Sequence, residues 1–364
     1  MRCLAGWNLT LAILLGALML ITSQFIDKYT ISDESLLENG SFAAGLSGWS
    51  LDESDKDRIS VSDGAIHIRS TDAVQNPRLW QDIDISRMGQ FVHFSGWVKT
   101  EQIVAGEKPW NMGRIILVQL RDEKADYSMP HVLIALNGTT QWQYHETVFP
   151  IHSDTEKVLV MIQMSKSTGT ISCKNLALAK ASLSLYYKVA RTVALTCWVC
   201  LIAILFYPVF VQSREDVIVR VIILFLLGAI VAGTMMPGAI KNSIKYQIEQ
   251  EGAAVVERLS PESRSRAEPG PLGQKNDHDL SVDITKVAHF FLFAMLTLML
   301  LWSGYSEDIW YIILTIIILA CGTELAQLFV EGRSALLTDV ALDLAGCAFG
   351  SILWILLRKR FKLK

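Results

Sequence analysis

The chain has 364 residues, of which 51% are hydrophobic and 19% are charged, and its formal net charge is −3. Soluble domains carry about 25% charged residues, so this composition excludes a purely soluble globular enzyme, and the apolar content excludes a mainly disordered chain. The slight acidity excludes a basic field over the whole chain, and we therefore expect no nucleic-acid partner.

Six apolar runs approach the length of about 20 residues that a helix needs to cross a bilayer. They occupy residues 7–26, 188–211, 217–236, 287–303, 309–329 and 338–357. No A-x-A-like cleavage site follows the first run, so we expect an uncleaved membrane anchor rather than a secretory signal peptide. The runs predict a multi-pass protein whose first partner is the lipid bilayer.

Basic residues indicate which side of the membrane each end of the chain faces, since Lys and Arg concentrate in short cytoplasmic segments. Five Lys or Arg residues lie between 358 and 364, and Arg2 precedes the first apolar run. We therefore expect both termini in the cytoplasm. Six crossings then place the segments 27–187, 237–286 and 330–337 on the outer, periplasmic or extracellular, side.

The outer segment 27–187 has the pattern of an all-β domain. Short runs that alternate apolar and polar residues are typical of half-buried strands. They lie at 65–68, 91–94, 115–118 and 158–162. Gly, Asn, Asp and Pro residues separate these runs and mark turns. We expect eight or nine strands and see no convincing helix pattern, which predicts a β-sandwich or jelly roll over residues 30–185.

Four motifs in this segment resemble those of galactose-binding-like β-sandwiches, the family that includes many carbohydrate-binding modules. The motifs are Asn39-Gly40-Ser41-Phe42, Gly45-Leu46-Ser47-Gly48-Trp49 and the stretches 94–100 and 136–142. The resemblance covers residues 36–182 and implies a sandwich that binds a glycan. The closing strand at 171–176 departs from the pattern of the modules that hold calcium, so we expect no metal, and we also expect no cofactor.

Tryptophans are the candidates for sugar contacts, because an aromatic ring offers an apolar face to the C–H surface of a sugar. Trp49 and Trp97 lie in strand-like motifs, and we expect them in the core. Trp80 and Trp110 lie near predicted loops, and we expect these two to contact sugar. Trp142 is a further candidate.

Polar and ionisable residues gather at the predicted outer ends of the last three apolar runs. They are Lys286, His289, Glu324, Gln327, Arg333, Asp339 and Asp343. An ionised group costs about 2.5–3.5 kcal/mol at the centre of a membrane helix, so several together require partners or a water-filled cavity. The simplest pairing joins Glu324 to Arg333, and Asp339 or Asp343 to Lys286 or His289.

The order and spacing of these residues resemble the VanZ-like family of bacterial membrane proteins. The pattern is Lys286-x-x-His289-Phe290, Glu324-x-x-Gln327, Arg333 and Asp339-x-x-x-Asp343-x-x-Gly346-x-x-x-Gly350, preceded by Pro237. It covers residues 217–357 and implies a cell-envelope protein of the bacterial inner membrane, from a family associated with glycopeptide-antibiotic resistance. The family usually has Asn where Asp343 stands, and the resemblance implies a site rather than a reaction.

The observations together predict five parts of the chain. They are a membrane anchor at 1–29, the outer β-sandwich at 30–185, a helix at 186–212, a four-helix VanZ-like domain at 213–357 with an outer loop at 237–286, and a basic cytoplasmic tail at 358–364. The loop is polar and mixed in charge, and its first part, 238–258, can form an interfacial helix.

Three functions fit this arrangement, and whether the protein is an enzyme stays open. The membrane site could act on a glycan or lipid-linked glycan, could form a structural ion-pair cluster in a binding or assembly factor, or could serve a proton-coupled transporter. The candidate catalytic residues are Glu324, His289, Asp339 and Asp343, and the candidate substrate-binding residues are Lys286, Gln327 and Arg333. The apolar cytoplasmic halves of the predicted spans disfavour the transporter.

Overall fold

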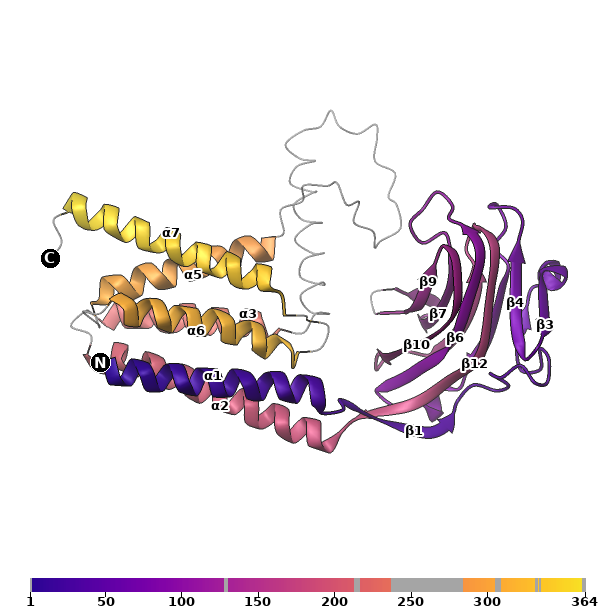
Figure 1. Ribbon diagram of the computed structural model, residues 1–364, viewed down its shortest axis with the longest axis horizontal. Helices are drawn as coiled ribbons and strands as arrows, with labels where there is room; N and C mark the ends of the chain where they lie inside the picture. Colours follow the sequence, from indigo (N-terminus) through magenta and orange to yellow (C-terminus); the bar gives the residue numbers. More distant parts are fainter. Residues whose placement is uncertain are drawn as a thin grey trace, which may run out of the picture. The chain divides into compact units, whose positions relative to one another are not determined.

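The computed structural model shows two compact units in the chain (Figure 1). It describes residues 2–127, 130–212, 217–236, 284–304, 309–330, 333 and 335–361. Tyr29–Ser184 form the β unit, and the segments before and after them form the helical unit. Pro237 and the predicted interfacial helix at 238–258 lie outside the described residues.

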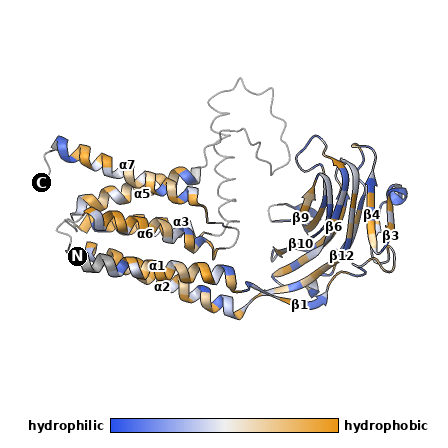
Figure 2. Cartoon of the chain, viewed as in Figure 1, coloured by the Kyte–Doolittle hydropathy of each residue, from blue (hydrophilic) through white to orange (hydrophobic). Residues whose placement is uncertain are grey.

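Six described helices of the helical unit are long and apolar enough to cross a membrane. They are α1 (Arg2–Phe25), α2 (Leu185–Gln212), α3 (Val217–Met235), α5 (Ile284–Ser303), α6 (Ile309–Gln327) and α7 (Leu337–Phe361). Each overlaps one of the predicted apolar runs, so the prediction of six candidate spans is confirmed. Figure 2 shows the hydrophobic residues that continue along these helices.

Contacts between the helices show which of their ends lie together. Asn8 Nδ2 donates to the Tyr311 hydroxyl at 3.3 Å, and Gly16 packs against Leu325, so α1 and α6 run in the same direction. A ring contact with centroids 6.3 Å apart joins the first turn of α2 to the turn that follows α6. The C-terminal ends of α1 and α6 therefore lie at one end of the helical unit, together with the N-terminal end of α2.

The β unit is a sandwich of two antiparallel sheets, as predicted. Sheet A has the order β10-β6-β12-β4-β3 with β1 paired to β12, and sheet B has the order β2-β5-β11-β7-β8 with β9 paired to β7. The strands of sheet A are β1 (Tyr29–Ser35), β3 (Ile59–Ser62), β4 (Ala65–Ser70), β6 (Phe91–Val104), β10 (Gly138–Pro150) and β12 (Thr168–Leu183). The strands of sheet B are β2 (Ser50–Leu51), β5 (Arg78–Ile83), β7 (Gly113–Arg121), β8 (Lys124–Asp126), β9 (Val132–Leu136) and β11 (Lys157–Met164). The described residues form two six-stranded sheets, which is more strands than the expected eight or nine. Edge strands as short as β2 and β8 leave little pattern in the sequence.

Alternation along the strands determines which side chains enter the core between the two sheets. On β6, the side chains of Val92, Phe94 and Val98 are fully buried in this core. His93, Ser95 and Trp97 therefore point to the outer face of sheet A, because successive side chains of a strand point to opposite faces.

The first and last strands of the β unit pair with each other. In this antiparallel pair, Tyr29 of β1 lies opposite Leu183 of β12. The chain therefore enters and leaves the β unit at neighbouring positions.

A buried glutamine holds the loop between β1 and β2. Gln81 on β5 is 5% exposed, and its Nε2 donates to the carbonyl oxygens of Glu38 and Gly48, each at 2.9 Å. Its Oε1 accepts from the Glu38 N–H at 2.8 Å. One side chain thus satisfies three backbone groups of a loop that lies outside the strands.

We expect Gln81→Leu to lower the free energy of unfolding of the β unit by roughly 2–4 kcal/mol, because it leaves three backbone groups without partners. Urea unfolding of the full-length protein in detergent, followed by circular dichroism, measures the change. The control is Gln143→Leu on β10, where the glutamine is exposed and the effect should stay within about 0.5 kcal/mol. Equal stabilities of the two variants would contradict this role of Gln81.

Candidate functional site

Helices α5 and α7 lie in backbone contact along a stripe of small residues. A Cβ atom at Gly346 would overlap the carbonyl oxygen of Phe290, and one at Gly350 would overlap that of Ala294. The residue numbers increase together along both helices, so α5 and α7 run parallel. Their glycines allow the close approach that small residues provide between membrane helices.

This contact aligns two ion pairs at the N-terminal ends of α5 and α7. Lys286 Nζ lies 3.9 Å from Asp339 Oδ1, and His289 Nδ1 lies 3.4 Å from Asp343 Oδ1. The predicted pairing of the two aspartates with Lys286 and His289 is therefore confirmed. The Lys286 side chain is half exposed, whereas Asp343 is fully buried.

The predicted pairing of Glu324 with Arg333 is wrong. Glu324 is 4% exposed, and it accepts hydrogen bonds from the Leu336 backbone N–H at 2.8 Å and from Gln327 Nε2 at 3.3 Å. Leu336 directly precedes α7, where backbone N–H groups have no partner inside the helix, so the carboxylate finds donors there without the arginine. Within the described residues Arg333 forms no ion pair, and its backbone N–H donates to the Val330 carbonyl at 3.3 Å.

The polar end of the helical unit has more acceptors than donors. It comprises Lys286, His289, Glu324, Gln327, Asp339 and Asp343, and it lies where α1 ends and α2 begins. In the described part of the chain, neither carboxylate oxygen of Asp343 accepts a hydrogen bond, and Asp339 Oδ1 accepts none. A buried carboxylate without hydrogen bonds is costly, so this end can receive a proton or a donor group of a ligand. His289 is placed to carry such a proton.

The two tryptophans predicted to contact sugar, Trp80 and Trp110, do not form one cluster. Trp80 lies on β5 of sheet B, and Trp110 lies in the turn before β7. Both are partly exposed, and each has a cation over its ring. Arg78 Cζ lies 5.3 Å from the Trp80 ring centroid, and Lys108 Nζ lies 5.2 Å from that of Trp110. Each is therefore a single ring with one face already in use.

An aromatic cluster that was not predicted lies on the outer face of sheet A. Trp97 is 38% exposed, and Tyr144 lies opposite it on β10, is 48% exposed and has its ring centroid 5.6 Å away. Lys174 lies opposite Trp97 on β12, and its Nζ is 4.5 Å from the Trp142 ring centroid. We call Trp97, Trp142, Tyr144 and Lys174 the aromatic patch. The expectation that Trp97 is a core residue is wrong, whereas Trp49 is buried as predicted.

Polar groups surround the aromatic patch on the same face of sheet A. Glu146 accepts from the Tyr144 hydroxyl at 3.3 Å and lies 3.1 Å from His93 Nε2. His67 on β4 lies between two serine hydroxyls, at 2.8 and 3.0 Å from its ring nitrogens. Exposed rings with hydrogen-bonding groups beside them are the usual composition of a ligand site.

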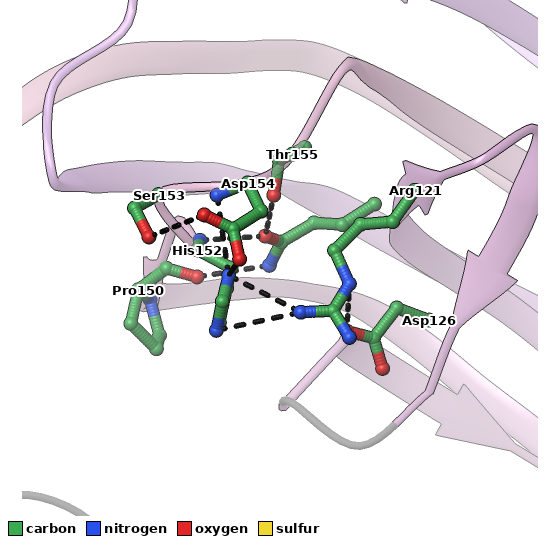
Figure 3. Close-up of polar contacts among 8 residues, drawn as sticks. Arg121, Asp126, Pro150, His152, Ser153, Asp154 and Thr155 are labelled. Atoms are coloured by element: carbon green, nitrogen blue, oxygen red, sulfur yellow. Dashed lines mark hydrogen bonds and ion pairs between the residues drawn. The ribbon is translucent and has the colours of Figure 1, made fainter.

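A second polar cluster, at the edge of sheet B, holds a turn in place (Figure 3). Arg121 lies 3.3 Å from Asp126 and 3.3 Å from His152 Nδ1. Buried Gln119 accepts from the His152 backbone N–H and from the Thr155 hydroxyl, each at 2.9 Å. These side chains bind one another and the backbone, so we assign the cluster a structural role.

We expect Gly346→Ala to push α5 and α7 apart and to weaken the pair of His289 with Asp343, because the new methyl group overlaps the Phe290 carbonyl. Overpacking of this kind costs about 1–3 kcal/mol. The measurement is the melting temperature of the full-length protein in detergent. Gly228→Ala on α3 is the control, because a Cβ there meets no atom within 4 Å. If both variants melt like the wild type, the contact does not position the pair.

Solved structures similar to this chain include two carbohydrate-binding modules and a phage protein. A family 16 carbohydrate-binding module has a TM-score of 0.30 and 16% identity, over 39% of this chain and 98% of that one. The CBM22-1 xylan-binding domain from Paenibacillus barcinonensis has a TM-score of 0.29 and 16% identity, over 43% and 99%. The enzymatically active domain of tailspike protein 4 from bacteriophage CBA120 has a TM-score of 0.31 and 13% identity, over 40% of this chain and 21% of that one.

Among curated proteins, none matches this chain significantly. The model of the family described as VanZ/LLP1 matches residues 192–358. The match begins before residue 217, where the predicted resemblance starts. It includes most of α2, all of α3, α5 and α6, and most of α7. The helical unit therefore contains a segment similar to the VanZ/LLP1 family, as the order of its ionisable residues predicts.

Proposed function

We propose that this protein binds an envelope glycan with its β unit and holds the lipid-linked end of such a glycan at its polar end. The observation that carries the proposal is the aromatic patch. Large exposed aromatic side chains gathered on one face of a sheet favour a binding surface over a plain solvent surface. A sugar has apolar C–H faces and a rim of hydroxyls, which suit these rings and the polar groups beside them.

The helical unit supplies the membrane half of the proposed function. The carboxylates of the polar end lie at the same end of this unit as the end of α1 and the start of α2. We assign this end and the β unit to the outer side of the inner membrane, and both termini to the cytoplasm. A lipid-linked glycan has its sugar in water and its lipid in the bilayer, which fits the two units.

The polar end has the groups for acid–base chemistry on an anionic linkage. His289 beside Asp343 can accept or donate a proton, and Glu324 can do the same if it exchanges its bond to Leu336 for one to the substrate. Lys286 is half exposed and can attract a phosphate as a point charge. Arg333 and Gln327 extend this set of binding groups.

A second candidate function is a binding or assembly factor without catalysis. The observation that favours it is the pairing of Lys286 with Asp339 and of His289 with Asp343. Paired charges at the N-terminal ends of two parallel helices can hold those helices together, and this role needs no catalysis. In that case the β unit alone recognises the glycan.

We expect Trp97→Ala to weaken glycan binding at least tenfold, because truncation of an aromatic anchor costs roughly 2 kcal/mol. Binding of the purified full-length protein to an array of envelope glycans measures the effect. The matched controls are Trp80→Ala and Trp110→Ala, which should bind like the wild type. Loss of binding in a control variant, with Trp97→Ala unaffected, would move the site away from sheet A.

We expect Glu324→Gln and Arg333→Ala to change the pool of lipid-linked glycans in the native host while the protein level stays normal. Mass spectrometry of extracted lipids, together with quantification of the protein in membranes, measures both. Glu123→Gln in the exposed turn between β7 and β8 is the control. Loss of the protein, or an unchanged pool at normal protein level, would favour the binding or assembly factor without catalysis.

A further inference from the structure

The carboxylates beside the aromatic patch are already paired. Glu101 forms an ion pair with Lys99 at 2.6 Å, and Glu146 lies 3.1 Å from His93 Nε2, a contact that is an ion pair only when the imidazole is protonated. The hydrogen bond from Lys99, and then its charge, lower the pKa of Glu101 below its ordinary value, so Glu101 stays ionised and paired. Each of these two carboxylates therefore has a partner other than Lys174.

Lys174 is a cation that belongs to the aromatic patch itself. Within the described residues its side chain forms no ion pair, and its Nζ lies over the Trp142 ring, 4.5 Å from the ring centroid. Arg69 on β4, exposed on the same face, also forms no ion pair there. An ammonium group has three N–H donors, and a contact with a ring face supplies no acceptor lone pair for them.

The Trp142 ring holds the ammonium in position without neutralising its charge. A cation–π contact at an exposed site is weak compared with a hydrogen bond between two charged groups. A negatively charged ligand can therefore bind Lys174 without first breaking an ion pair. The rings of Trp97 and Tyr144 lie beside this charge, so a sugar stacked on them would bring its substituents to Lys174.

We propose that the glycan bound at the aromatic patch carries a negatively charged group, a carboxylate or a phosphate, and that Lys174 binds this group. The inference rests on the proposed glycan binding and names the class of glycan. Trp97 and Tyr144 bind the sugar ring, and Lys174 donates charge-assisted hydrogen bonds to the anion.

The test applies the full-length protein, in nanodiscs of phosphatidylcholine, to an array of envelope glycans. Each acidic glycan is printed beside a neutral counterpart, in which the carboxyl group has been reduced or the phosphate removed. We expect the acidic members to bind about tenfold more tightly than their neutral counterparts. The difference should shrink between about 0.01 M and about 1 M salt, because the Debye length falls from about 30 Å to about 3 Å. Comparison of the carboxylate-bearing glycans with the phosphate-bearing glycans shows which of the two anions the protein prefers.

Three variants connect the preference to Lys174. Lys174→Met keeps an apolar stem and removes the charge. Acidic glycans should bind this variant no more tightly than their neutral counterparts do. The neutral glycans should bind the variant and the wild type equally well. Lys174→Arg keeps the charge and should keep the preference. Lys124→Met, at an exposed lysine on β8 of sheet B, should bind like the wild type.

The outcomes separate this inference from the function on which it rests. Equal binding of acidic and neutral members by the wild type overturns the inference and leaves glycan binding intact. A preference that persists in Lys174→Met also overturns it. Absence of binding to every glycan, by a wild-type protein that shows a cooperative thermal transition, overturns the proposed glycan binding itself.

Discussion

Both ion pairs of the polar end depend on the backbone contact between α5 and α7. Helices in a bilayer gain little from burying apolar side chains against each other, so close packing has to bring them together. The glycines at 346 and 350 permit that packing, and the parallel direction of the two helices then places Lys286 and His289 opposite Asp339 and Asp343.

A comparable constraint operates in the β unit, where alternation divides each strand between two surroundings. Burial of Val92, Phe94 and Val98 in the core forces Trp97 onto the outer face. The pairing of β6 with β10 and β12 then places Tyr144 and Lys174 on either side of it. In both units the backbone and core packing determine which candidate functional groups lie opposite one another.

The six helices and the sandwich were predictable because apolar length and strand alternation are local properties of the sequence. The pairing of the aspartates with Lys286 and His289 was predictable because spacings of three and four residues share a helix face. The partner of Glu324 was not, since the backbone N–H of Leu336 leaves no sequence pattern. The aromatic patch needs residues from three strands in register, yet the alternation after Phe94 already assigns Trp97 to the outer face.

The pairing of β1 with β12 makes the β unit an insertion between two helices. Its two ends lie on adjacent strands, which are about 5 Å apart in a sheet, so any module with similarly close ends could occupy the same place between α1 and α2. The helical unit would keep its chain direction in such an exchange. A different module could therefore replace the β unit without any change to the residues of the helical unit.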